Sequence, residues 1–164
     1  MLILDANENI QWSMQEITAS PLPNLETLKV ACCQQIVNKH VLAILAPSLA
    51  QRSLRSLSLV GCHRLNFHSF DWLVKHCVNL EKLAITLSRT VTDEALKEVI
   101  KFNMLRYLNL TGCDISPNGL MNVLNGLPGA LREIVISPSL GNVTEVTRLA
   151  AKSGVKITQR LGYY

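Results

Sequence analysis

The sequence predicts an α/β fold: a curved, right-handed solenoid with parallel strands on its concave face and helices on its convex face. Three observations lead there. Leucine fills 27 of the 164 positions, whereas all aromatic residues together fill 8, which suits many similar small packing units. The pattern Leu-x-x-Leu-x-Leu recurs along the chain. Apolar residues at helical spacing follow each complete pattern, so strands and helices alternate.

The strands are predicted from the recurring pattern, in which valine or isoleucine can replace the later leucines. It begins at Leu25, Leu54, Leu80, Leu105 and Leu131, at intervals of 29, 26, 25 and 26 residues. The second and third apolar places are two residues apart, as in a strand with one buried face. We therefore expect one short strand in each of these five units.

A helix is predicted later in each unit. The spacing of Phe70, Leu73, Val74 and Cys77 places these side chains on one helical face. Thr92-Asp93-Glu94 and Ser116-Pro117-Asn118 are helix-start signals. One strand and one helix cannot bury their apolar faces alone, so neighbouring units should stack into a continuous core.

Both ends of the chain extend the pattern. Leu2 and Leu4 fall on the strand places of a truncated unit, whose strand we expect another repeat or chain to cover. Val155-Lys156-Ile157 is predicted to form a last edge strand. The expected organisation is a repeat domain over 1–158, with one partial and five full units, and a C-terminal tail over 159–164.

The ninth place of each unit holds a small side chain. These residues are Cys33, Cys62, Ser88, Cys113 and Ser139. An odd total of five cysteines, most of them on repeat positions, favours reduced thiols and an intracellular protein, cytoplasmic or nuclear, with a mitochondrial location as the alternative. We expect Cys33, Cys62 and Cys113 to be buried, reduced and without a ligand.

A 26-residue period, cysteine at the ninth place and the turn Val91-Thr92-Asp93 resemble the cysteine-containing leucine-rich repeats of F-box proteins and their relatives. Leu54 to Cys62 and Leu105 to Cys113 fit best. The resemblance implies a substrate-binding array. It also implies an Skp-type adaptor that binds through a separate F-box, because this chain contains no F-box pattern.

Several classes of function are not expected. Cys62, His63, His68, His76 and Cys77 lack the paired spacing of a structural zinc site, so no metal is assigned. Motifs for nucleophilic catalysis or nucleotide cofactors are missing, so we predict no catalytic residue and no cofactor. No apolar run approaches the roughly 18 residues of a membrane span. Net charge is +4, and a nucleic-acid partner would need a denser basic face.

The concave face is the predicted partner-binding surface, because side chains between the buried leucines point away from the core. Its candidates are Lys29, Ser56, Ser58, Lys82, Ala84, Tyr107, Asn109, Thr111 and Glu133. Most positions on this face are small, which suggests a smooth, near-neutral trough with Tyr107 as its one large anchor. Beside it we expect an edge of charges, formed by Arg55, Glu81, Arg106 and Arg132 after Glu26.

Two functions follow as hypotheses. The first is a non-catalytic protein-recognition module, the substrate-binding part of an F-box-type (SCF-like) ubiquitin ligase. The alternative is a structural scaffold subunit of a large assembly, since similar repeats occur in axonemal, DNA-repair and mitochondrial assembly factors. An exposed sheet face must be polar or small in any case, and the charged edge could equally be a solvated row, so no single position is decisive.

Overall fold

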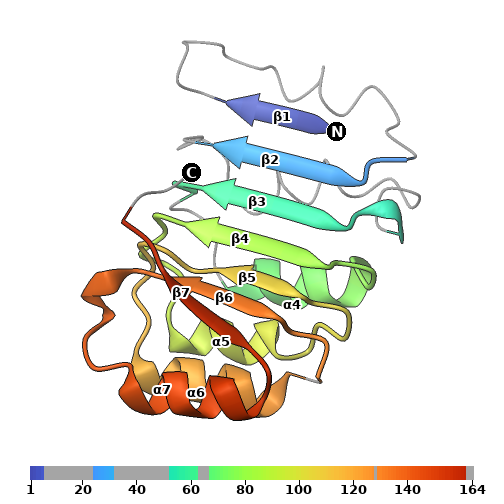
Figure 1. Ribbon diagram of the computed structural model, residues 1–164. Helices are drawn as coiled ribbons and strands as arrows, with labels where there is room; N and C mark the ends of the chain where they lie inside the picture. The colour runs from blue at the N-terminus through green and yellow to red at the C-terminus, as the bar shows by residue number, and fades with distance from the viewer. Residues whose placement is uncertain (6–23, 32–51, 63–66, 128, 162–164) are drawn as a thin grey trace.

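The computed structural model describes residues 1–5, 24–31, 52–62, 67–127 and 129–161. Within them, seven parallel strands form one sheet in chain order (Figure 1). The strands are β1 (Leu2–Asp5), β2 (Thr27–Ala31), β3 (Ser56–Val60), β4 (Lys82–Thr86), β5 (Tyr107–Asn109), β6 (Glu133–Ile136) and β7 (Lys156–Gln159). The predicted α/β repeat architecture is confirmed.

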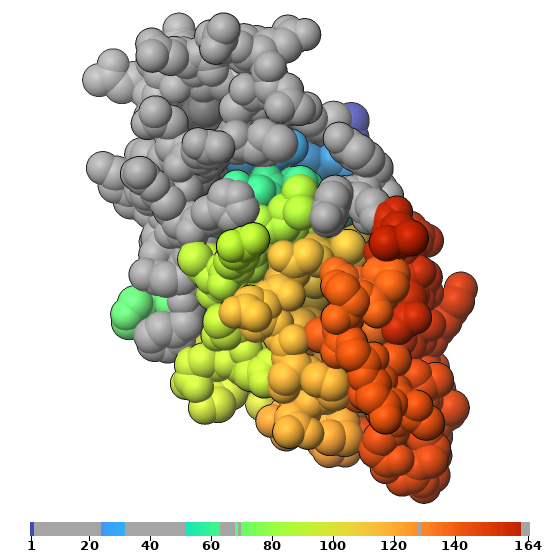
Figure 2. Space-filling view, turned by 90° about the vertical axis from the view of Figure 1, so that its left-hand side faces the viewer, coloured from blue at the N-terminus to red at the C-terminus, as the bar shows by residue number. Residues whose placement is uncertain are grey.

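Helices lie together on one side of this sheet (Figure 1). They are α4 (Phe67–His76), α5 (Asp93–Val99), α6 (Pro117–Gly126) and α7 (Thr144–Lys152), with a short 3₁₀ turn, η1 (Pro138–Leu140). Each of these α-helices packs against the next one along the chain. Figure 2 views the molecule from the carboxyl ends of the strands. In this view the units from green to red lie side by side in chain order.

The core is built from rows of equivalent side chains. The strand register aligns Leu28, Leu57, Leu83, Leu108 and Ile134. All five are at most 1% exposed, so the predicted continuous buried row is confirmed. Because every unit contributes the same side of its strand, one core runs through the described units.

The helix starts occur where the sequence predicts them. Thr92 precedes α5 and Ser116 precedes α6, each in an extended conformation. Ser116 Oγ accepts a hydrogen bond from the backbone nitrogen of Gly119 and donates one to the Asp93 carboxylate. The Asp93 carboxylate also accepts from the backbone nitrogen of Ser116, at 2.8 Å. This acid therefore joins the start of α5 to the start of α6.

A left-handed turn follows each of three central strands. Gly61, Leu87 and Gly112 occupy the eighth place of successive units, with φ of 64°, 55° and 75°. A Cβ on Gly112 would lie 3.1 Å from the Leu87 side chain and 3.2 Å from its backbone. The left-handed conformation thus favours glycine at residue 112 without requiring it, since the equivalent place of the preceding unit holds leucine. The close approach of Leu87 adds a steric reason for glycine at residue 112.

The ends of the sheet agree with the expected truncated unit and last strand. β1 pairs with β2, and β7 pairs with β6. The boundary at 158 needs correction, because β7 runs through Gln159 and the Arg160 nitrogen donates to the Ile136 carbonyl. The connections over 6–23 and 32–51 lie outside the described residues. No helix within the described part of the chain is long and apolar enough to cross a membrane.

Candidate partner-binding face

The sheet face opposite the helices carries three rows of side chains, set by the strand register. The first row, at the amino ends of the strands, is Thr27, Ser56, Lys82, Tyr107, Glu133 and Lys156. The second row is Lys29, Ser58, Ala84, Asn109, Val135 and Thr158. The third row, at the carboxyl ends, contains Ala31, Val60 and Thr86 by register and continues to Thr111 and Ser137.

The first row is open. Lys82 and Lys156 are exposed, and Ser56, Tyr107 and Glu133 are half-buried. In the second row Lys29 is exposed, and Ser58, Ala84 and Asn109 are half-buried. The structure therefore brings eight of the nine sequence-selected residues onto one accessible face, in two adjacent rows.

The ninth residue, Thr111, does not belong to that accessible set. It is 2% exposed, and its hydroxyl donates to Asn109 Oδ1 at 2.7 Å. The Asn109 oxygen also accepts from the Thr111 backbone nitrogen at 3.0 Å. Thr111 is thus a buried turn residue, and Asn109 has only its amide nitrogen left to offer a partner. The alternation of the strand identified the face but gave no sign of this local turn.

The third row is buried at two of its five places, Thr86 and Thr111, whereas Ala31, Val60 and Ser137 are half-buried. Thr86 is also 2% exposed, and Oγ1 of Thr86 is a buried side-chain oxygen without a hydrogen-bond partner in the structure. Val135, in the second row, is fully buried as well. The expected smooth trough is therefore interrupted by three buried side chains, Thr86, Thr111 and Val135.

Some of the charged side chains along the predicted edge form ion pairs with one another. Nη1 of Arg55 lies 2.8 Å from Oε1 of Glu81, and Nε of Arg106 lies 4.0 Å from its other oxygen. Arg132 donates instead to the backbone carbonyls of Gly129 and Leu131. One carboxylate thus lies between two guanidinium groups, and the third guanidinium is fixed without an acidic side chain. Sequence order predicted the row but not these pairings.

The ninth-place residues differ in burial along the chain. Cys62 and Ser88 are fully buried, whereas Ser139 is exposed. Cys113 was expected to be buried but is only half-buried, because it borders a surface hollow of about 250 Å³. This hollow is lined by Leu110, Cys113, Asp114, Ile115, Ser137, Ser139 and Leu140. Cys62 is a buried thiol as predicted, and Cys33 lies outside the described residues.

The thiols have structural contacts. Cys113 Sγ donates to the Ile85 carbonyl of the preceding unit at 3.1 Å, and Cys62 Sγ donates to the Val60 carbonyl at 3.7 Å. Burial raises the pKa of Cys77 and of Cys113 to about 12. At neutral pH both are protonated thiols, which are poor nucleophiles and poor metal ligands.

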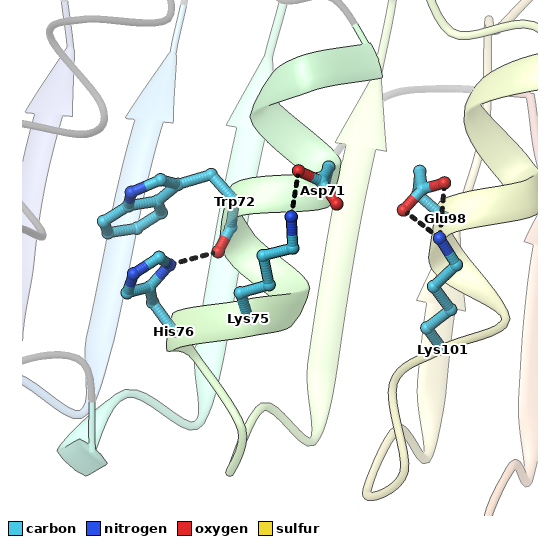
Figure 3. Close-up of polar contacts among 6 residues, drawn as sticks. All are labelled: Asp71, Trp72, Lys75, His76, Glu98 and Lys101. Carbon is cyan, nitrogen blue, oxygen red and sulfur yellow. Dashed lines mark hydrogen bonds and ion pairs between the residues drawn. The ribbon is translucent and has the colours of Figure 1, made fainter.

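Within the part of the chain that the structure describes, no three His, Cys, Asp or Glu side chains gather closely enough to hold a metal ion. His63, one of the residues considered for zinc, lies outside that part. His76 instead stacks on Trp72, with ring centroids 4.2 Å apart, and its Nδ1 donates to the Trp72 carbonyl (Figure 3). The i, i+4 spacing of the two residues was the available sequence signal for this pair.

The comparison with protein families matches a segment at the centre of this face. Residues 103–124 match the family model described as "Leucine Rich repeat". The segment contains all of β5, with Tyr107 and Asn109, and most of α6. Proteins built from such repeats are generally protein-interaction modules and are usually non-catalytic. By sequence and by structure, then, this chain carries a leucine-rich repeat at residues 103–124 within an α/β array of parallel strands.

Proposed function

We propose that this protein is a non-catalytic recognition module that binds a protein partner across the first and second rows of its sheet. The observation that carries the proposal is the accessibility of these rows over a rigid, fully packed core. Tyr107 lies in the middle of the first row, between Lys82 and Glu133. A half-buried tyrosine offers rigid apolar area together with a hydroxyl, a combination common at the centres of protein interfaces.

The more specific proposal is that the module selects substrates for an F-box-type ubiquitin ligase. Its support is the cysteine-type repeat pattern, with Cys62 and Cys113 at equivalent places and both on the carboxyl side of a strand. The alternative, a scaffold subunit, would use the same face for a permanent partner. Co-purification of the full-length gene product with an Skp-type adaptor distinguishes these two, because only the ligase requires that adaptor.

Photo-crosslinking tests the recognition face itself. Tyr107 is replaced by p-benzoylphenylalanine, and the matched control places the same group at Val78, which is 52% exposed in the turn after α4. We expect a reproducible protein adduct from position 107 that excess unmodified protein suppresses. Adducts that form only from position 78 would refute the proposal.

Once a partner has been identified by its adduct, alanine substitution measures the contribution of the tyrosine. Tyr107→Ala should weaken binding by about 30-fold, equivalent to about 2 kcal/mol for a central interface residue. Val78→Ala should leave the affinity within about twofold. Equal effects of the two substitutions would show that Tyr107 is not at the centre of the interface.

A further inference from the structure

The recognition face consists of the first two rows of the sheet and the charged edge beside them. Some of its charged side chains have a partner of opposite charge and others do not, and this difference indicates what the face binds. On the helix side, acids one helical turn away pair with Lys75, Lys97, Lys101 and Arg148. Figure 3 shows two of these pairs, Lys75 with Asp71 and Lys101 with Glu98. Those cations are already neutralised by their own helices.

Within the part of the chain that the structure describes, the lysines of the sheet face have no such partners. Among the described residues, no carboxylate oxygen lies within 4.0 Å of the side-chain nitrogen of Lys29, Lys82 or Lys156. Glu133 is directly opposite Lys156 in the strand register, but its Oε1 accepts a hydrogen bond from Thr158 Oγ1 at 2.6 Å. Glu81 is engaged by Arg55 and Arg106.

The balance of charge on this face is positive. The first two rows and the charged edge together carry six cations, Lys29, Lys82, Lys156, Arg55, Arg106 and Arg132, against three carboxylates, Glu26, Glu81 and Glu133. The sequence-based expectation of a near-neutral trough omitted β7, which adds Lys156 to the first row. Six cations against three carboxylates leave an excess of three positive charges, which favours a partner of opposite sign electrostatically.

The spacing of the cations specifies the shape of that partner. Lys82 and Lys156 are on β4 and β7, three strands apart, which corresponds to roughly 14 Å across the sheet. In an extended peptide, residues i and i+4 are separated by about the same distance. Tyr107 and Glu133 lie between the two lysines, and the tyrosine ring can pack against the intervening part of such a peptide.

We infer that the partner presents an extended acidic segment, which crosses the amino ends of β4 to β7 with carboxylates near Lys82 and Lys156 and its middle against Tyr107. This inference rests on the proposed recognition function and specifies the chemistry of its partner. Charge complementarity of this kind mainly provides selectivity and fast association, so binding should weaken as salt is added.

The experiment uses three synthetic decapeptides, in which glycine alternates with glutamate, glutamine or lysine. Amide NMR spectra of the isotope-labelled full chain report where each peptide binds and how tightly. The glutamate peptide should shift the amides of Lys82, Tyr107 and Lys156. Its affinity should exceed that of the glutamine peptide by about tenfold at low salt, and raising the salt to about 0.3 M should remove most of that difference.

The matched variants have equal net charge. Lys82→Gln with Lys156→Gln should reduce affinity for the glutamate peptide by about tenfold or more. Lys75→Gln with Lys97→Gln, on the helices, should leave it within about twofold. Equal losses in both variants, no glutamate binding, glutamate binding no tighter than glutamine, or shifts confined to the helices would overturn the inference. If cross-linking from position 107 succeeds while the acidic preference fails, the recognition face stands and only the partner chemistry is wrong.

Discussion

The two ends of the strands differ more than the repeat pattern implies. At the carboxyl ends, the chain turns through left-handed positions and buries Thr86, Ser88 and Thr111. At the amino ends, Lys82 and Lys156 are exposed beside Tyr107. In open α/β sheets ligands usually bind at the carboxyl ends of the strands. In this protein those ends hold buried structural contacts and a surface hollow beside Cys113, and the exposed Lys82 and Lys156 are at the amino ends.

The largest effect is expected where the carboxyl ends connect to helices. In Gly119→Ala, the new Cβ would lie 2.1 Å from Oδ1 of Asp93, which holds the backbone nitrogen of Ser116. Displacing this carboxylate breaks hydrogen bonds to Ser116, so urea unfolding should show a loss of about 2–3 kcal/mol. Gly129→Ala, with no atom within 4 Å of its Cβ, is the control. A similar loss in both variants would argue against the Asp93 contact.

A second effect concerns the left-handed turn at Gly112. Gly112→Ala should destabilise by about 1–2 kcal/mol, because the backbone strain adds to contact with Leu87. Gly154→Ala at φ of 69° has open space around its Cβ and should show the strain alone, about 1 kcal/mol. Thermal unfolding of both variants measures the two losses of stability, and their difference gives the contribution of the contact between the new Cβ and Leu87. If Gly112→Ala is the milder change, the units are less tightly apposed at their carboxyl ends than described.

The buried threonines of the third row offer a test with opposite signs. Thr86→Val removes an oxygen that has no hydrogen-bond partner, so stability should rise by about 0.5–1 kcal/mol. Thr111→Val, at the same 2% exposure, loses the bond to Asn109 and should cost about 1 kcal/mol. Chemical denaturation measures both. Destabilisation by Thr86→Val would mean that its hydroxyl has a structural role.

Alkaline pH should weaken the core through the buried thiol of Cys77. Burial raises the pKa of Cys77 to about 12 from an ordinary value of 9.0. Below pH 9 this thiol is protonated in both states and contributes no pH dependence. Between pH 9 and 12 the unfolded chain loses the proton first, so stability falls as pH rises. The slope of unfolding free energy against pH should therefore be shallower in Cys77→Ala than in the natural protein, and identical slopes would contradict a buried thiol.

The smallest effect on stability is expected at the amino ends. Glu81→Gln breaks the contacts with Arg55 and Arg106, but these guanidinium groups are more than half exposed, so the cost should be about 0.5 kcal/mol or less. The same substitution removes one negative charge, so the net charge of the face becomes more positive by one. Affinity for the glutamate decapeptide should therefore increase, by about two- to threefold at low salt. A decrease would show that Glu81 positions the arginines for the partner.

The sequence was sufficient to predict the repeat, the register and the core, because each depends on a spacing repeated several times. Leu57, Leu83 and Leu108 are interchangeable members of one row, so an error at any single unit would have been corrected by its neighbours. The start of α6 was equally predictable, since Ser116-Pro117 is a local signal that needs no tertiary context.

The candidate site was predictable only in part. Strand alternation placed Tyr107 and Lys82 on the correct face, but alternation says nothing about burial, and Thr111 and Val135 proved to be covered. The pairing of Glu81 with two arginines depends on side-chain conformations across strands 26 residues apart in one case and 25 in the other. The exposure of Cys113 depends on how η1 packs beside it, which a repeat pattern does not encode.

The in-register pairing of every strand has an evolutionary consequence. Leu28 aligns with Leu57 and Leu57 with Leu83, although the intervals are 29 and 26 residues, so the differences in length fall between the strands and leave the register unchanged. Duplication or loss of a whole unit would preserve the alternation of core and surface along the sheet. Insertion of one residue within a strand would exchange its two faces and place leucines in water. Such a protein can lengthen its recognition face by whole units, and new specificities can arise by changing first-row residues without disturbing the leucines beneath them.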